Sequence, residues 1–116
     1  MPEPPAAERY LPLRPVVFAV LLSLELRPRH GYAVMQAVNE QLGRTALVGP
    51  GTLYRTLKEL RDGGLIEPAP GAQASEDERR RYYRPTALGR AVARAEAQRL
   101  AGLVEQARRA KLLEGT

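Results

Sequence analysis

Apolar residues recur at helical spacing in three segments of the N-terminal half of the chain. The first, from Val16 to about Leu26, follows Pro15 and is apolar nearly all the way round. A second runs from Gly31 to Leu42, and a third from about Pro50 to Asp62. We therefore expect three helices, and in so small a protein the first helix should pack partly on another chain. The expected inward face of the second helix consists of Tyr32, Met35, Val38 and Leu42.

The third predicted helix has a marked start and a marked end. Pro50 suits the first helical position after Gly49, and the pair Gly63–Gly64 supplies a left-handed stop. The face opposite its apolar stripe is small, hydroxylic and basic, as in a helix that enters the major groove of DNA. An ordinary amphipathic surface helix is the alternative. The stripe is Leu53, Leu57 and Leu60, and the opposite face is Gly51, Thr52, Arg55, Lys58 and Glu59.

The second and third helices, joined by the turn Gly43 to Gly49, predict a helix-turn-helix arrangement. The pattern then becomes extended: Leu65 to Glu67 predicts a strand, Pro68 to Glu78 a polar loop, and Arg79 to Arg84 a return strand. A hairpin directly after a recognition helix is a wing, which places Arg79, Arg80 and Arg81 near the DNA backbone or minor groove. The alternative is that these arginines pair with the acids of Glu76 to Glu78 across the hairpin.

A long final helix is predicted from Ala87 to about Leu113, with Thr86 as its cap after Pro85. Its length exceeds what the winged domain can cover. A first stripe of Leu88, Val92 and Ala95 can pack on that domain, whereas a coiled-coil-like seam needs another helix. We therefore expect a two-fold dimer. The seam consists of Ala93, Ala97, Leu100, Val104 and Ala107.

Together these elements predict a mainly α protein: a winged helix-turn-helix with a two-stranded wing and a long C-terminal dimerisation helix. We expect three parts in the chain. Residues 1–13, with four prolines, form an irregular N-terminal arm on the surface or on a partner subunit. Residues 14–86 form the winged domain, and residues 87–116 form the dimerisation helix.

Charge supports a polyanionic partner. The 116-residue chain has 18 Lys and Arg against 13 Asp and Glu, a net charge of +5. A nucleic acid is the natural partner for the arginine-rich stretch that begins at the wing, and a solvated face is the alternative. That stretch contains Arg79, Arg80, Arg81, Arg84, Arg90 and Arg94 with no acid among them.

Other function classes find little support. The chain has no cysteine and one histidine, so neither a metal site nor a cofactor is expected. We interpret His30 as a helix cap or turn residue rather than a ligand or catalytic group. No nucleophile with a base and no phosphate-binding glycine loop occurs, so an enzyme is not expected. The longest apolar run, Val16 to Leu24, is too short to span a membrane, and we expect a cytoplasmic protein.

The sequence resembles the PadR-like family of bacterial winged-helix transcriptional regulators, in its short form with a single C-terminal helix. Three segments carry the resemblance: HGYAVMQAV (His30 to Val38), PGTLYRTLKELRDGGLIE (Pro50 to Glu67) and RRYYRPTALGRAV (Arg80 to Val92). The resemblance implies a homodimer, usually a repressor, that binds a roughly palindromic operator in double-stranded DNA. Some relatives bind aromatic or drug-like molecules between their subunits and then release DNA.

Carried onto this sequence, the resemblance implies three sets of residues. Because the chain has no tryptophan, a ligand pocket that stacks on tryptophan is not available. The candidate pocket residues could line a smaller apolar cavity, but core or dimer packing is the favoured interpretation for them. Tyr54 fits either packing or a phosphate contact. A winged-helix module that binds protein or RNA is the alternative function. The DNA-contact candidates are Gly51, Thr52, Tyr54, Arg55, Lys58, Arg79, Arg80, Arg81, Tyr32 and His30; the dimer candidates are Phe18, Leu21, Leu22, Ala97, Leu100, Val104 and Ala107; the pocket candidates are Phe18, Leu22, Leu100 and Val104.

Overall fold

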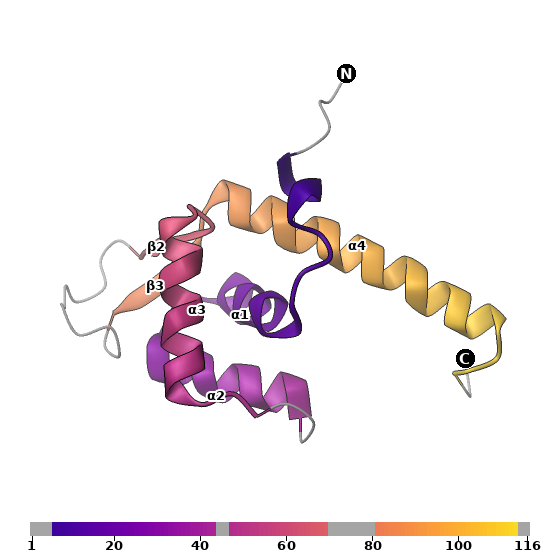
Figure 1. Ribbon diagram of the computed structural model, residues 1–116, viewed down its shortest axis with the longest axis horizontal. Coiled ribbons are helices and arrows are strands. Elements are labelled where there is room, and N and C mark those ends of the chain that lie inside the picture. Colours follow the sequence, from indigo (N-terminus) through magenta and orange to yellow (C-terminus); the bar gives the residue numbers. More distant parts are fainter. Residues whose placement is uncertain (1–5, 44–46, 70–80, 114–116) are drawn as a thin grey trace.

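A computed structural model describes residues 6–43, 47–69 and 81–113 of the chain. The protein is mainly helical, and the long last helix extends away from the rest of the molecule (Figure 1). The molecule is correspondingly elongated, with extents of 49 × 41 × 21 Å. The helices are the 3-10 helix η1 (Ala6–Tyr10), α1 (Pro15–Leu26), α2 (Gly31–Leu42), α3 (Pro50–Asp62) and α4 (Ala87–Arg109).

A small antiparallel sheet has the strand order β1-β3-β2. The predicted hairpin is present as β2 (Ile66–Pro68) and β3 (Tyr82–Pro85), with Glu67 opposite Arg84. A third strand, β1 (Arg29–His30), pairs with the other edge of β3, where the sequence indicated only a chain break. The predicted return strand began at Arg79, whereas β3 begins at Tyr82; Arg79 and Arg80 lie outside the described residues.

Helix α1 forms the centre of the core, with α2, α3 and α4 around it (Figure 1). Its low-polarity sequence is explained by these contacts, because Val17, Val20, Leu21 and Leu24 are all buried within the single chain. Leu21 is completely buried, so the prediction that it reaches a partner subunit is wrong. The exposed large apolar side chains of α1 are Leu22 and Leu26.

The predicted inward face of α2 is confirmed except at Tyr32. Val38 is buried and Met35 and Leu42 pack against the core, whereas Tyr32 is 52% exposed. Val34 and Ala37, which were not predicted, are also buried. The sequence pattern was anchored on Tyr32, but a tyrosine ring carries a polar hydroxyl and is often accommodated at a surface. Ala37 is too small to mark an apolar face in a sequence, although it allows close helix packing.

The two ends of the chain differ most from expectation. Residues 6–13 are not an irregular arm, because η1 packs against α4 of its own chain and Ala7 belongs to the core. Helix α4 ends at Arg109 rather than Leu113. Arg108 and Arg109 lie in its last turn, where cations interact favourably with the helix dipole. Leu112 continues the apolar pattern but lies beyond the helix, after Lys111 in a left-handed conformation.

Candidate nucleic-acid interface

The turn between α2 and α3 is held by the side chain of Asn39. Its Nδ2 donates to the carbonyl of Val48 at 3.1 Å, and the amide of Val48 donates to Oδ1 at 2.6 Å. A side-chain amide that satisfies both backbone groups of one residue replaces the hydrogen bonds of a regular turn. Asn39 thus fixes the approach to Gly49 and Pro50, where α3 begins.

Helix α3 has the two faces that the sequence predicted. Leu53, Leu57 and Leu60 are buried, and Thr56 joins them by donating its hydroxyl to the carbonyl of Thr52. The other face is open to solvent and consists of Gly51, Thr52, Arg55, Lys58 and Glu59. This face presents a hydroxyl group, a guanidinium and an ammonium, the side-chain donors that contact phosphates and base edges.

Arg55 and Lys58 differ in their partners. Within the described part of the chain, Arg55 has neither a hydrogen bond nor an ion pair. The ammonium of Lys58 instead contacts the carboxylate of Asp62 at 2.9 Å, one turn further along the helix. That hydrogen bond holds the pKa of Asp62 below its usual value. Arg55 is therefore the cation of α3 that is ready for an external anion.

The remaining candidates have more local roles. His30 caps α2, since its Nδ1 accepts from the amide of Ala33 at 3.2 Å, which confirms the capping interpretation. Its ring also packs edge-on against Tyr82 of β3, with centroids 5.3 Å apart. Tyr54 is half-buried against the core, which favours packing for this residue. Tyr32 is exposed at the first turn of α2, as a contact residue must be.

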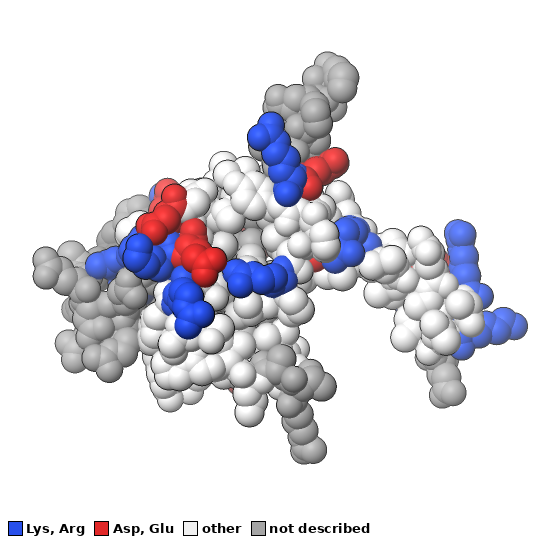
Figure 2. Space-filling view, in the orientation of Figure 1, with Lys and Arg blue, Asp and Glu red and all other residues white. Residues whose placement is uncertain are grey.

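Some arginines of the arginine-rich stretch that starts at the wing already pair with acids of the same chain and are therefore not free to bind an external anion. Arg84 pairs with Glu67 across the hairpin at 2.7 Å, and Arg90 pairs with Glu25 of α1 at 2.9 Å. Arg81 is half-buried at the start of β3. Figure 2 shows acidic and basic side chains side by side at the left of the molecule, where Figure 1 places α3. The sequence analysis did not predict these two ion pairs, because Glu67 and Glu25 lie outside the arginine-rich stretch.

The base of the wing is joined to the start of α4 by Thr86, which the sequence predicted only as a cap, and by Gly89, which the sequence analysis did not single out. Thr86 caps α4 by accepting from the amide of Gly89 at 3.0 Å, as predicted, and its hydroxyl donates to the carbonyl of Gly64. The amide of Thr86 donates to the carbonyl of Leu65 at 3.0 Å. A Cβ at Gly89 would overlap that same Leu65 carbonyl, so glycine is required there.

Residues 20–95, most of the chain, match the family described as the transcriptional regulator PadR-like family. The chain belongs to this PadR-like family. Its helix-turn-helix, wing and start of α4 are thus the shared part, and the C-terminal half of α4 lies beyond it. No curated protein matches the chain.

Solved structures share the fold. A PadR-like transcriptional regulator from Bacillus cereus superposes with a TM-score of 0.66 at 22% identity, covering 87% of this chain and 93% of its own. A PadR family transcription regulator from hypervirulent Clostridium difficile gives a TM-score of 0.65 at 23% identity, covering 81% of this chain and 95% of its own. At such identities these structures establish a PadR-type winged helix and nothing about particular contacts.

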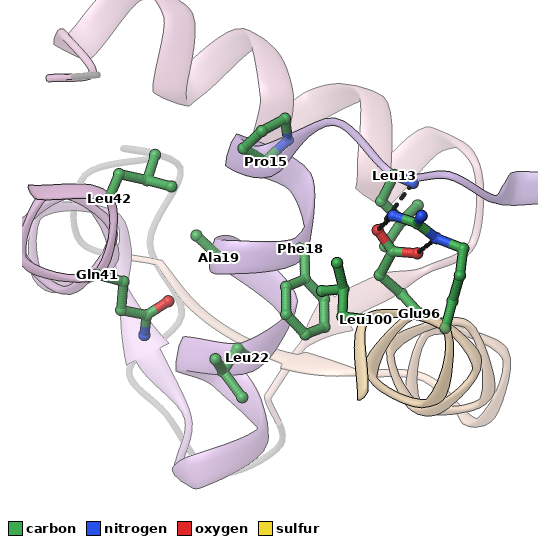
Figure 3. A pocket seen from close by; sticks show the side chains of 10 residues that line it. Leu13, Pro15, Phe18, Ala19, Leu22, Gln41, Leu42, Glu96 and Leu100 are labelled. Atoms are coloured by element: carbon green, nitrogen blue, oxygen red, sulfur yellow. Dashed lines mark hydrogen bonds and ion pairs between the residues drawn. The ribbon is translucent and has the colours of Figure 1, made fainter. Parts of the chain in front are cut away.

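A hollow of about 310 Å³ lies among α1, α2 and α4 of this PadR-like chain (Figure 3). Phe18, Leu22 and Leu100, predicted as pocket residues, line it, whereas Val104 does not. Val104 lies a full turn further along α4, beyond the end of the hollow. The other lining residues are Leu13, Pro15, Ala19, Gln41, Leu42, Glu96 and Arg99.

Glu96 is a buried carboxylate in the wall of this hollow, with 2% of its side chain exposed. It accepts two hydrogen bonds from the guanidinium of Arg99, at 2.6 and 2.8 Å, and a third from the amide of Leu13 at 3.2 Å. The bonds from Arg99 and then from Leu13 lower the pKa of Glu96, despite the opposing effect of burial. Glu96 thereby ties the segment before α1 to α4.

The C-terminal half of α4 carries an apolar face that its own chain does not cover. Leu103 is 49% exposed and Val104 is 43% exposed, while Leu100 and Ala107 are half-buried. Leu103 was missed by the sequence analysis, although it lies two helical turns after Glu96 and so continues the face that packs on the domain. Of the other predicted dimer residues, Ala97 and Leu22 are exposed and Phe18 is half-buried.

In residues 6–43, 47–69 and 81–113, no group of three or more His, Cys, Asp or Glu is placed to bind a metal ion. None of the helices in these same ranges has the length and apolarity required to cross a membrane.

Proposed function

We propose that this PadR-like protein is a sequence-specific DNA-binding regulator that represses transcription as a homodimer bound to a roughly palindromic operator. The observation that carries the proposal is the open face of α3, where Thr52 and Arg55 are exposed near Gly51 at the start of the helix and Arg55 has no partner among the described residues. In a helix-turn-helix protein, the N-terminal half of this helix is the part that reaches base edges.

Contacts assigned to the wing are part of the same proposal. Arg79, Arg80 and Arg81 precede β3, close in sequence to the hairpin that follows α3. Cations on a wing bind phosphates or the minor groove and contribute affinity more than sequence choice. Tyr32, at the exposed first turn of α2, and Lys58 complete the proposed backbone contacts.

Dimerisation is supported by the uncovered apolar face of α4. A single chain leaves Leu103 and Val104 exposed together, next to the half-buried Leu100. Burying such a face against the same face of a second copy is the simplest closed arrangement. Two copies then present two α3 helices to successive turns of one side of a duplex, as palindromic operators require.

Release by a small molecule is supported by the hollow among α1, α2 and α4. Its volume of about 310 Å³ suits a small apolar or aromatic molecule, and its walls are mostly apolar. The hollow adjoins both α1 and the part of α4 that leads into the proposed dimer face. A ligand there would therefore change the angle between the two DNA-binding domains. We place the regulator in the cytoplasm, together with its DNA.

The test is selection of bound fragments from the source organism's DNA by the purified full-length chain, followed by titration of selected and random duplexes at several salt concentrations. The proposal predicts enrichment of a palindromic sequence and an affinity that falls steeply with salt, because each phosphate contact adds about 0.9 to the slope of log affinity against log salt. A module that binds protein or RNA would enrich no duplex and show no such dependence on duplex DNA.

A further inference from the structure

The cations beside the open face of α3 are held by carboxylates. Asp62 binds Lys58 at 2.9 Å on the helix itself, and Glu59 of the same helix binds Arg14 at 3.4 Å. On the wing, Glu67 binds Arg84 at 2.7 Å. Both members of each pair are substantially exposed to solvent. Figure 2 shows the resulting mixture of red and blue over this side of the molecule.

These pairs are poorly arranged to stabilise the fold. Asp62 is the last residue of α3, where the helix dipole disfavours a negative charge. The order of Lys58 before Asp62 is also the weaker orientation for a pair four residues apart. Exposed ion pairs of this kind contribute little to folding. A contribution to the stability of α3 therefore does not explain why an aspartate occupies position 62.

DNA supplies that explanation, because phosphates compete for the same cations. To contact a phosphate, Lys58 or Arg84 must leave its carboxylate, and the carboxylate is then brought close to the negative backbone. The cost applies to every duplex, whatever its sequence. Arg55 has no such cost within the described residues, so its contact is gained in full.

We propose that Glu59, Asp62 and Glu67 form a carboxylate screen that limits non-specific binding of this protein to DNA. The inference rests on the proposed DNA-binding function. The screen weakens attraction to phosphates in general, so that appreciable occupancy requires the base contacts of the α3 face. Excess cationic charge would otherwise hold the protein on the large number of non-specific sites that a genome offers.

The experiment compares the full-length chain with Asp62→Asn and with the triple variant Glu59→Gln/Asp62→Asn/Glu67→Gln on a fluorescent duplex of random sequence. At low salt we expect the affinity to rise about threefold for Asp62→Asn and about twentyfold for the triple variant. The salt dependence of the triple variant should steepen by about two, because its freed cations replace more counterions. Glu105→Gln is the matched control: it removes one exposed acid that faces Arg108 on α4, and should change neither quantity.

Unchanged affinity and unchanged salt dependence in the triple variant would overturn the screen while leaving DNA binding intact. An equal rise for Glu105→Gln would overturn it as well, because net charge alone would then explain the effect. Failure of both the wild-type chain and the variants to bind any duplex at low salt would instead overturn the proposed function, and the screen with it. If circular dichroism shows that the triple variant is unfolded, the affinity of Asp62→Asn for the random duplex tests the screen by itself, and an unchanged affinity overturns it.

Discussion

Gly89, in the first turn of α4, lies directly against the backbone carbonyl of Leu65, at the junction between α3 and the wing. The hydroxyl of Thr86 caps the same turn and also reaches the carbonyl of Gly64. The start of α4 and the base of the wing are therefore one rigid unit. The end of α3 is joined to the same unit, because the amide of Leu65 donates to the carbonyl of Leu60 at 2.8 Å. The proposed dimer helix is thereby linked to the proposed DNA-binding helix.

Substitution of Gly89 by alanine tests this contact. The new methyl group would overlap a backbone atom that cannot rotate away, so we expect Gly89→Ala to lower the free energy of unfolding by about 1–3 kcal/mol. Gly102→Ala is the matched control on the same helix, because nothing lies within 4 Å of its position; it should raise stability by up to about 1 kcal/mol. Urea unfolding measures both, and equal effects of the two substitutions would refute the close approach.

The pair Glu96–Arg99 predicts a second stability effect. Arg99→Met leaves the buried Glu96 carboxylate with only the amide of Leu13, so we expect the free energy of unfolding to fall. The loss should be smaller than for a fully buried ion pair, because Arg99 is 34% exposed and solvent screens its charge. Urea unfolding at neutral pH measures it, and a variant as stable as the wild type would show that the pair holds nothing in place.

The same pair makes stability depend on pH with a definite sign. The pKa of Glu96 is lower in the folded chain than its ordinary value of 4.5, so the unfolded chain takes up a proton first as the pH falls. The stabilisation from ionised Glu96 is present above pH 4.5 and disappears as the pH falls through the folded-state pKa. Glu96→Gln should remove this component, so wild type and variant should converge in stability in acid; a constant difference across the range would contradict the assignment.

The exposed face of α4 predicts how a dimer can be separated without unfolding the chain. Val104→Asp places a charge in the proposed interface but outside the core of the single chain, so we expect a folded monomer. Gln98→Asp, at an exposed position about opposite on the helix, is the matched control and should leave the assembly unchanged. Light scattering after gel filtration measures the mass, and a wild-type chain that is monomeric would remove the dimer from the proposal.

The sequence predicted the elements whose ends are fixed locally. Proline at the first helical position and glycine after the last residue placed α3 from Pro50 to Asp62, and an uninterrupted apolar pattern placed α1. Strand β1 was missed because its two residues have no local strand pattern and are defined only by pairing with β3. The buried position of Glu96 was missed for a similar reason, since its partner Leu13 is distant in the sequence.

In the candidate site, too, the features set by local sequence were predictable, and those set by contacts between distant residues were not. The stripe of leucines was enough to predict which residues of α3 are exposed, among them Thr52 and Arg55. Pairing was less predictable: Glu67 meets Arg84 only through the hairpin register, and Arg14 meets Glu59 only through the packing of α1 against α3. The pair Lys58–Asp62 has helical spacing and was open to prediction from the sequence alone.

Binding of the Arg55→Ala variant to the selected duplex tests the central claim, that the open face of α3 reads DNA. We expect affinity for that duplex to fall about tenfold or more, as for loss of a base or phosphate contact by arginine, while light scattering shows an unchanged assembly. Affinity for random duplex should fall much less. An Arg55→Ala protein that binds the selected duplex as tightly as the wild type would contradict the claim.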